Sequence, residues 1–468
     1  MENTSKLASA GNTKTGLAKW FSLVILLMAQ IGTMGDNSGL SVATASLINE
    51  LGASVSDIAF ANAMYPLIAG ACMIAGGMLG LIWGWKRLFQ VGALLIDKFD
   101  YRVAFEALAV YFGIVFVLGF ALEKIEKPTV KIKFDFVGTI LVSIGLLAVI
   151  VGLLKISEWG LISPLSPSFH ILGISPALPL VLFGIAVLII FLKWENQFEI
   201  KNGACLMPQS FVKTPQLRDG LYMCGMVFFV LGAYILIGIT YCQLVAGYSA
   251  TDTAVLLTVF STGMLITSLA TPTKFAHVSC RKLCMIGIGF CVLAAISGAL
   301  GTELDSVNMI FFGSALFTGL GCGVIASQAS LIVTAAVNQR DATQSGGVQA
   351  TSRNIGQTIG IAVLGSVLMF SLTNMVKSDA ANSDLISVQT KQQVEQIASI
   401  PFLSDKDFTQ LVETNITEKQ DYPVLIDINR EARKSAAQLS WLVLAAMCFI
   451  SIFTLTKNIP NYSLSKKS

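Results

Sequence analysis

Long apolar runs are the feature that most constrains what this chain can fold into. A helix needs about 20 consecutive apolar residues to cross the hydrocarbon core of a bilayer. The chain has 468 residues, of which 54% are hydrophobic and 13% are charged, whereas a typical soluble domain has about 25% charged residues. We therefore predict an all-α polytopic membrane protein.

Eleven candidate membrane spans follow from these runs. They cover residues 18–48, 58–83, 103–122, 135–154, 174–193, 220–243, 253–271, 283–301, 307–336, 345–371 and 436–456. Most of the links between them are short. The two longer ones are residues 194–219 and a polar stretch between the tenth and eleventh spans.

The positions of Lys and Arg orient the chain, because these residues in short loops mark the cytoplasmic side of a membrane. The N-terminal tail carries Lys6 and Lys14, and no small-residue cleavage site follows a short apolar core, as a signal peptide would require. We therefore place the N-terminus in the cytoplasm.

One step of this orientation fails. Lys86 and Lys124 both belong to basic clusters that mark inside loops, yet only one full span, 103–122, lies between them. The other candidate, residues 88–96, would rise about 13 Å as a helix, under half of the ~30 Å core. Either a crossing is truncated here, or the charge bias misplaces one cluster, since it is not a strict rule.

Asp36 is the first candidate for a functional residue, because it lies at the inner end of an otherwise lipid-compatible run. A carboxylate near mid-membrane is costly and usually functional, and burial lets it take up and release protons near neutral pH. The alternative is that Asp36 lies at the outer membrane edge or caps a short helix starting near residue 37. Glu106, one turn into the third span, is a secondary candidate for a proton site.

The tenth span carries a second group of candidates. Gly356 and Gly360 are four residues apart, a spacing that lets another helix approach closely. Arg353 and Gln357 have the same spacing and so share one face of the helix. Arg353 can pair with a carboxylate or an anionic group, or it can extend its side chain to the cytoplasmic interface.

Several activities are disfavoured by the sequence. There is no G-x-x-x-x-G-K-[ST] nucleotide-binding loop, and no G-x-S-x-G or H-E-x-x-H pattern of a hydrolase. Cys280 and Cys284 have no second ligand pair for zinc. The net charge of +3 is too small to indicate a nucleic-acid partner. We expect neither an enzyme nor a resident cofactor or metal.

Three stretches resemble the fourteen-span drug–proton antiporter branch of the major facilitator superfamily. MGDNSGLSVATASLINELGAS (34–54) is similar to its first-span motif, with Asp36 on the motif's Asp and Ala45 where Pro is usual. SGGVQATSRNIGQTIGIAVLGSVL (345–368) is similar to its penultimate-span signature. FDFVGTILVSIGLLAVIVGLLKISEWG (134–160) resembles the first of the two extra central spans of this branch.

A pattern after the second span resembles the superfamily's loop motif. Gly77, Leu79, Gly84, Lys86 and Arg87 fit that motif, and Leu81 stands where the family has the Asp that takes part in locking the inside gate. The resemblance implies a role in gating for Gly77, Gly84, Lys86 and Arg87. It implies a place at the bundle interface for Arg353 and its neighbours on the tenth span.

Relative to that family, the chain jumps near residue 96 from early in the third span to just before the sixth. At ~20 residues for each span, plus loops, the loss is on the order of 80–100 residues. It explains both the failed crossing and a count of eleven spans where the family has fourteen. We therefore predict a major-facilitator-type two-bundle architecture with an incomplete N-terminal bundle.

The predicted organisation has six parts. They are a cytoplasmic tail (1–17), an incomplete N-terminal helix bundle (18–122), two extra central spans with cytoplasmic linkers (123–219), a C-terminal helix bundle (220–372), an outside loop (373–434), and the last span with a cytoplasmic tail (435–468).

The resemblance implies a secondary active transporter, with proton-coupled efflux of lipophilic or cationic small molecules of the multidrug type. Asp36 would carry the proton or pair with the substrate, and Arg353 would organise the interface between bundles. The expected partners are a small-molecule substrate, protons and the lipid bilayer, with the chain acting as a monomer in a bacterial inner membrane.

Two alternatives remain open. The chain can be an internally deleted, transport-incompetent member of the same family, because half of one bundle would lack its packing partners. It can also be a membrane receptor or interaction protein that uses residues 373–434 to bind a partner.

Overall fold

The computed structural model describes residues 134–160, 174–202, 205–304, 306–337, 342–397, 399–455 and 458–463, together with positions 110, 113, 114 and 117. The chain divides into two compact units, and all described residues from Phe134 onward belong to one of them. The first two predicted spans lie outside the described residues, and of the third (103–122) only these four positions are described, all of them helical.

Eight helices in the described part are long and apolar enough to cross a membrane. They are α6 (Phe136–Leu154), α8 (Ala177–Asn202), α10 (Pro215–Leu244), α11 (Ala250–Thr273), α12 (Cys280–Gly301), α13 (Met309–Ala336), α14 (Ala342–Asn382) and α17 (Tyr422–Leu455). They correspond to the last eight predicted spans. The described residues form no β-sheet, which confirms the all-α polytopic class.

Five short helices complete the described part: α7 (Ile156–Trp159), α9 (Gln209–Lys213), α15 (Val388–Gln396), α16 (Asp405–Asn415) and the 3-10 turn η2 (Lys419–Asp421). Two long helices extend beyond the predicted spans. α14 continues to Asn382 and α17 already begins at Tyr422, because polar residues can continue a helix after its apolar stretch has ended. Most of the region predicted as an outside loop is therefore helical.

Several helix starts follow from polar capping residues in the sequence. The side chains of Ser249, Ser279 and Asn308 accept hydrogen bonds from the first-turn backbone N–H groups of α11, α12 and α13. Such caps satisfy donors that a helix cannot pair internally. Because these caps supply acceptors for the first-turn N–H groups, each of the three helices can begin directly after a short link.

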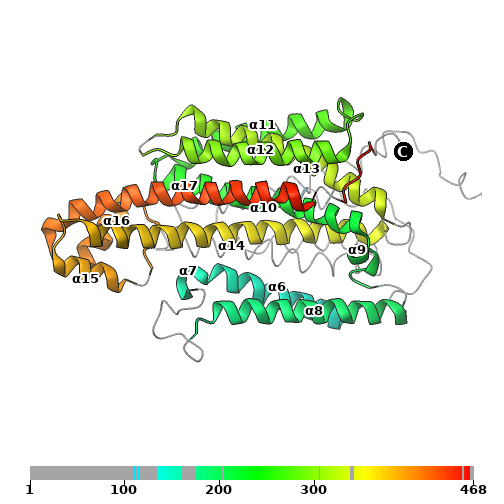
Figure 1. Ribbon diagram of the computed structural model, residues 1–468, viewed down its shortest axis with the longest axis horizontal. Helices are drawn as coiled ribbons and strands as arrows, with labels where there is room; N and C mark the ends of the chain where they lie inside the picture. The colour runs from blue at the N-terminus through cyan, green and yellow to red at the C-terminus, as the bar shows by residue number, and fades with distance from the viewer. Residues whose placement is uncertain are drawn as a thin grey trace, which may run out of the picture. The chain divides into compact units, whose positions relative to one another are not determined.

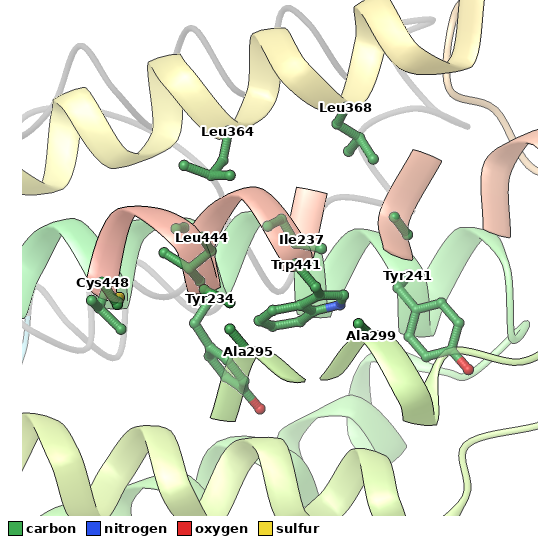
Figure 2. Close-up of a cluster of buried hydrophobic side chains, with 14 of the residues drawn as sticks. Tyr234, Ile237, Tyr241, Ala295, Ala299, Leu364, Leu368, Trp441, Leu444 and Cys448 are labelled. Atoms are coloured by element: carbon green, nitrogen blue, oxygen red, sulfur yellow. The ribbon is translucent and has the colours of Figure 1, made fainter. Parts of the chain in front are cut away.

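Helices α10 to α14 and α17 pack into one bundle, in which α17 lies beside α12 and α14 (Figure 1). Trp441 of α17 is fully buried at its centre. Its ring centroid lies 5.8 Å from that of Tyr234 (Figure 2). It lies 6.1 Å from that of Phe311. Gly298 makes room for it, since a Cβ there would lie 2.6 Å from the indole.

Helices α6 and α8 form a pair of their own (Figure 1). Gly145 and Gly184 face each other in this contact, and a Cβ on Gly184 would lie 2.7 Å from the carbonyl oxygen of Gly145. The pair also contacts α14, where the Ser366 hydroxyl donates a hydrogen bond of 2.9 Å to the carbonyl oxygen of Leu153.

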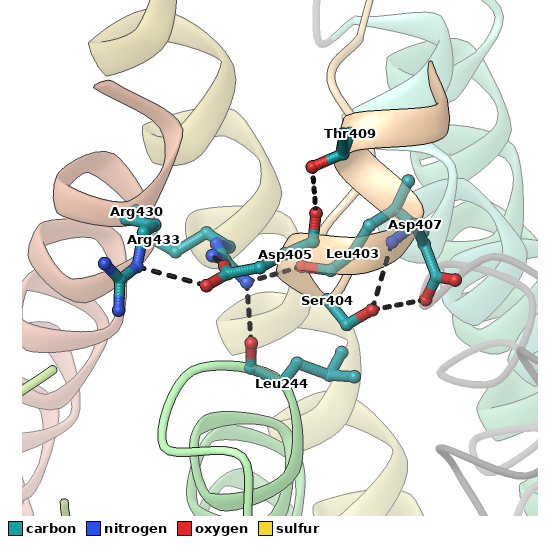
Figure 3. Close-up of polar contacts among 8 residues, drawn as sticks. All are labelled: Leu244, Leu403, Ser404, Asp405, Asp407, Thr409, Arg430 and Arg433. Atoms are coloured by element: carbon teal, nitrogen blue, oxygen red, sulfur yellow. Dashed lines mark hydrogen bonds and ion pairs between the residues drawn. The ribbon is translucent and has the colours of Figure 1, made fainter. Parts of the chain in front are cut away.

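Residues 383–421 between α14 and α17, here called the connecting segment, are anchored by Arg433 of α17 (Figure 3). Arg433 Nη1 donates hydrogen bonds of 2.6 Å to the carbonyl oxygens of Leu244 and Leu403, and its Nη2 pairs with the Asp405 carboxylate. The Arg433 side chain is 1% exposed. One buried cation thus joins the end of α10, the start of α16 and the middle of α17.

We expect the substitution Arg433→Met to destabilise the protein by about 3 kcal/mol, because it leaves two buried carbonyl oxygens without a donor. Thermal unfolding of the purified protein in detergent measures this loss, and protease cleavage within the connecting segment should speed up. Arg430→Met is the matched control, because Arg430 Nε also pairs with Asp405, at 3.1 Å, but its side chain is 29% exposed. It should cost no more than about 1 kcal/mol. Equal losses in the two variants would contradict the anchoring role.

Candidate functional site

The structure describes only part of the predicted site. The residues outside the described part are the proton or substrate candidates Asp36 and Glu106 and the gating candidates Gly77, Gly84, Lys86 and Arg87. The remaining candidates all lie on α14, which packs against α10, α17 and α6.

Gly356 and Gly360 lie in the contact between α14 and α10. A Cβ on Gly356 would lie 2.0 Å from the carbonyl oxygen of Gly225, and one on Gly360 would lie 2.3 Å from that of Phe229. The Ser352 hydroxyl donates a hydrogen bond of 2.6 Å to the carbonyl oxygen of Leu221 in the same contact. The two backbones therefore touch with no room for side chains, as small residues permit in membrane helices.

Arg353 is half-buried beside this contact. Its Nη2 donates a hydrogen bond of 3.0 Å to the Ser330 hydroxyl of α13, and its guanidinium carbon lies 5.8 Å from the centre of the Phe228 ring. Gln357, one turn further along α14, is buried. Among the described residues, the partners of Arg353 are thus a hydroxyl and an aromatic face, and no ion pair with a carboxylate is recorded. The fixed guanidinium remains suited to an anionic group or a carbonyl oxygen.

A cavity of about 270 Å³ lies against the α10–α14 contact. Its walls are mainly apolar and rich in sulfur-containing side chains, and they come from α10, α14 and α17. The lining residues are Tyr222, Gly225, Met226, Phe229, Ser352, Ile355, Gly356, Ile359, Met447, Cys448 and Ser451. Flexible Met side chains adapt to ligands of different shape, so the cavity suits a small lipophilic group.

Sequence reasoning found the glycine side of this cavity but missed the rest. Ser352 and Gly356 belong to the quoted signature, whereas Met226, Met447 and Cys448 are apolar residues in apolar helices. Nothing in a single sequence distinguishes such residues from lipid-facing ones. The one usable signal was the cluster of small and polar residues at 345–360.

No protein-family model matches the chain. Among curated proteins, it is 26% identical over 435 residues to a protein of Streptomyces coelicolor named "Probable actinorhodin transporter", an alignment that covers 76% of this chain and 73% of the relative. It is 23% identical over 372 residues to multidrug resistance protein Stp of Mycobacterium tuberculosis. That alignment covers 77% of this chain and 62% of the relative, less than two thirds of its length.

Among solved structures, the chain is similar to a bacterial homologue of the human lysosomal transporter Spinster in an inward-facing, occupied conformation. The TM-score is 0.44 at 14% identity, over 94% of this chain and 98% of that chain. A TM-score of this size is too low to define the fold.

The names of these curated relatives, one a transporter and one a multidrug resistance protein, confirm the predicted resemblance to multidrug-type transporters. By this relationship the chain is a multi-pass membrane transporter for small molecules, and not an enzyme.

The close contact of α10 and α14 leads to a prediction. The substitution Gly356→Ala should destabilise the protein by about 1–3 kcal/mol, because the new methyl group overlaps the backbone of Gly225 and the helices must separate. Gly346→Ala in the same helix is the matched control, because no heavy atom lies within 4 Å of a Cβ there. It should be neutral or stabilising by up to about 1 kcal/mol. Thermal unfolding in detergent compares the two variants, and an unchanged Gly356→Ala protein would refute the contact.

Proposed function

We propose that this protein is a proton-coupled exporter of lipophilic or cationic small molecules. The observation that carries the proposal is the apolar, methionine-bearing cavity where α10, α14 and α17 meet, directly beside the α10–α14 glycine contact. A lipophilic part of the substrate would occupy it. The printed names of the relatives, one for actinorhodin and one for multidrug resistance, support this substrate class.

We assign proton coupling to Asp36 because the sequence places this carboxylate within a predicted membrane span. A carboxylate within a span can bind either a proton or a cationic group of the substrate, and occupancy by one lowers the affinity for the other. Such competition produces exchange. Arg353, held by Ser330 and Phe228 near the glycine contact, would organise the interface between bundles in this scheme, as the resemblance implies. We place the protein in a bacterial inner membrane with its N-terminus in the cytoplasm.

The transport-incompetent alternative keeps some support from the alignment with the Streptomyces relative. That alignment is 435 positions long but covers only 76% of the 468 residues of this chain. The covered part is shorter than the alignment, so at some aligned positions the relative has a residue and this chain has a gap. An internal deletion of the predicted kind would produce such a difference. Activity therefore has to be tested on the chain as it stands.

The receptor alternative has less support. Ile400, Phe402 and Phe408 of the connecting segment are buried, and Arg433 holds its α16 end against α17 and the end of α10. A segment packed in this way offers fewer apolar groups to an external partner than a mobile loop would.

The first test is dye exchange in reconstituted vesicles under an imposed pH gradient. We expect the native chain to move a lipophilic cation and Asp36→Asn to abolish the movement, because the amide cannot cycle a proton. Exposed Asp252→Asn is the control and should keep full activity. If neither the native chain nor its Asn variant moves dye while a version with the missing spans restored does, the chain is transport-incompetent.

A larger side chain in the cavity tests whether the cavity binds the lipophilic part of the substrate. Met447→Trp should weaken binding of a fluorescent lipophilic cation at least tenfold, because the indole would occupy much of the 270 Å³ space. Met447→Leu conserves side-chain volume and should bind within about twofold of the native chain. Equal affinity in all three proteins would place the ligand elsewhere.

A further inference from the structure

Two buried carboxylates lie together where α6 begins and α8 nears its end, far along the chain from Asp36. Asp135 is the residue before α6 and is 1% exposed, and Glu195 of α8 is fully buried. Neither residue belongs to the site described above. Buried carboxylates are costly unless they are hydrogen-bonded, paired with a cation or protonated.

Because Gly138 has no side chain, both carboxylates extend into the space that a side chain there would occupy. A Cβ on Gly138 would lie 2.4 Å from Glu195 Oε1 and 2.5 Å from Asp135 Oδ2. The two oxygen atoms are therefore at most about 5 Å apart, since each lies within 2.5 Å of the same point.

The surrounding donors distinguish the two carboxyl groups. Asp135 accepts a hydrogen bond of 2.8 Å from the Gly138 N–H, and its two oxygens lie 3.1 and 3.0 Å from the indole nitrogen of Trp194. Glu195 Oε2 accepts one of 3.0 Å from the Met207 N–H, but Glu195 Oε1 has no donor among the described residues. Donors thus stabilise a charge on Asp135 and leave Glu195 Oε1 as the place for a proton.

In the described part of the chain, the other ionisable groups near this pair do not supply a positive charge. Glu199 lies one turn further along α8, and Cys205 follows the helix. Burial, and then the carboxylates of Glu195 and Glu199, raise the pKa of the Cys205 thiol far above its usual range, so it stays neutral and can donate its S–H. Among the described residues, no Lys, Arg or His forms an ion pair with Asp135 or Glu195.

We propose that Asp135 and Glu195 form a proton-binding site that holds one proton between them. The proton is bonded to Glu195 Oε1, which donates a hydrogen bond to Asp135 Oδ2. Two carboxylates this close and this buried cannot both remain ionised without strong repulsion. Release of the proton to solvent leaves two negative charges between α6 and α8 and drives these helix ends apart.

This site is additional to the exchange proposed at Asp36, and it exists whether or not the chain transports anything. Its consequence for the fold is a dependence on pH of the contact between α6 and α8. Leu153 of α6 accepts a hydrogen bond from Ser366 of α14. A movement of α6 that follows loss of the proton would therefore also displace α14 in the bundle.

Infrared difference spectroscopy of the purified full-length protein, between acidic and alkaline pH, tests the proposal. Every protein compared also carries Asp36→Asn and Glu106→Gln, so that these two carboxyl groups contribute no band. We expect the protein with Asp135 and Glu195 intact to show the carbonyl band of one protonated, buried carboxylic acid at neutral pH, and this band to disappear at alkaline pH. Glu195→Gln should lose the band and still fold, because an amide resembles a protonated carboxyl group in shape.

Glu413→Gln is the control, because Glu413 is an exposed residue of α16 and its replacement should leave the band unchanged. Absence of the band in the protein with Asp135 and Glu195 intact overturns the proposal. A band that persists in Glu195→Gln overturns it as well, because the proton would then belong to another group. Dye exchange plays no part in this readout, so failure of the transport proposal and failure of this one are separable.

Discussion

The backbone contact between α10 and α14 is the interaction on which the described bundle depends. Lipid tails are as apolar as Leu side chains, so burying apolar side chains does not by itself hold membrane helices together. Close packing has to supply the attraction. Gly225 on one helix and Gly356 and Gly360 on the other remove the side chains that would keep the backbones apart.

Two buried charged side chains, Arg433 and Asp135, lie where the fold supplies hydrogen-bond partners. Arg433 is fully buried but is placed where the carbonyl oxygen at the end of α10 and the start of α16 can accept its hydrogen bonds. Asp135 caps α6 and receives the Trp194 indole. Asp135 and the acceptors of Arg433 thus lie near helix ends, where the backbone leaves donors or acceptors unpaired. Glu195 Oε1 is buried without a hydrogen-bond partner among the described residues, as are Arg433 Nε, Trp441 Nε1 and the Asn429 amide, and in our proposal a proton occupies it.

The sequence predicted the eight described spans because each depends on the apolar content of one continuous stretch. It predicted that Gly356 and Gly360 suit a close contact, because their four-residue spacing is local. It did not identify the partners. Gly298 beneath Trp441, Asp405 beside Arg433, and Glu195 against Asp135 join residues 28 to 143 positions apart. Which helix meets which is set by three-dimensional packing, and no periodicity within one helix encodes it.

The packing also makes the stability of the described bundle independent of the spans that the chain lacks relative to the family it resembles. Its aromatic centre is built from α10, α12, α13 and α17, all downstream of residue 96. The α10–α14 contact and the Arg433 anchor are formed by the same part of the chain. A deletion near residue 96 removes none of these partners. If the chain does not transport, the cause would therefore be the missing part of the substrate pathway. A measurement of the stability of the described bundle would not detect that defect.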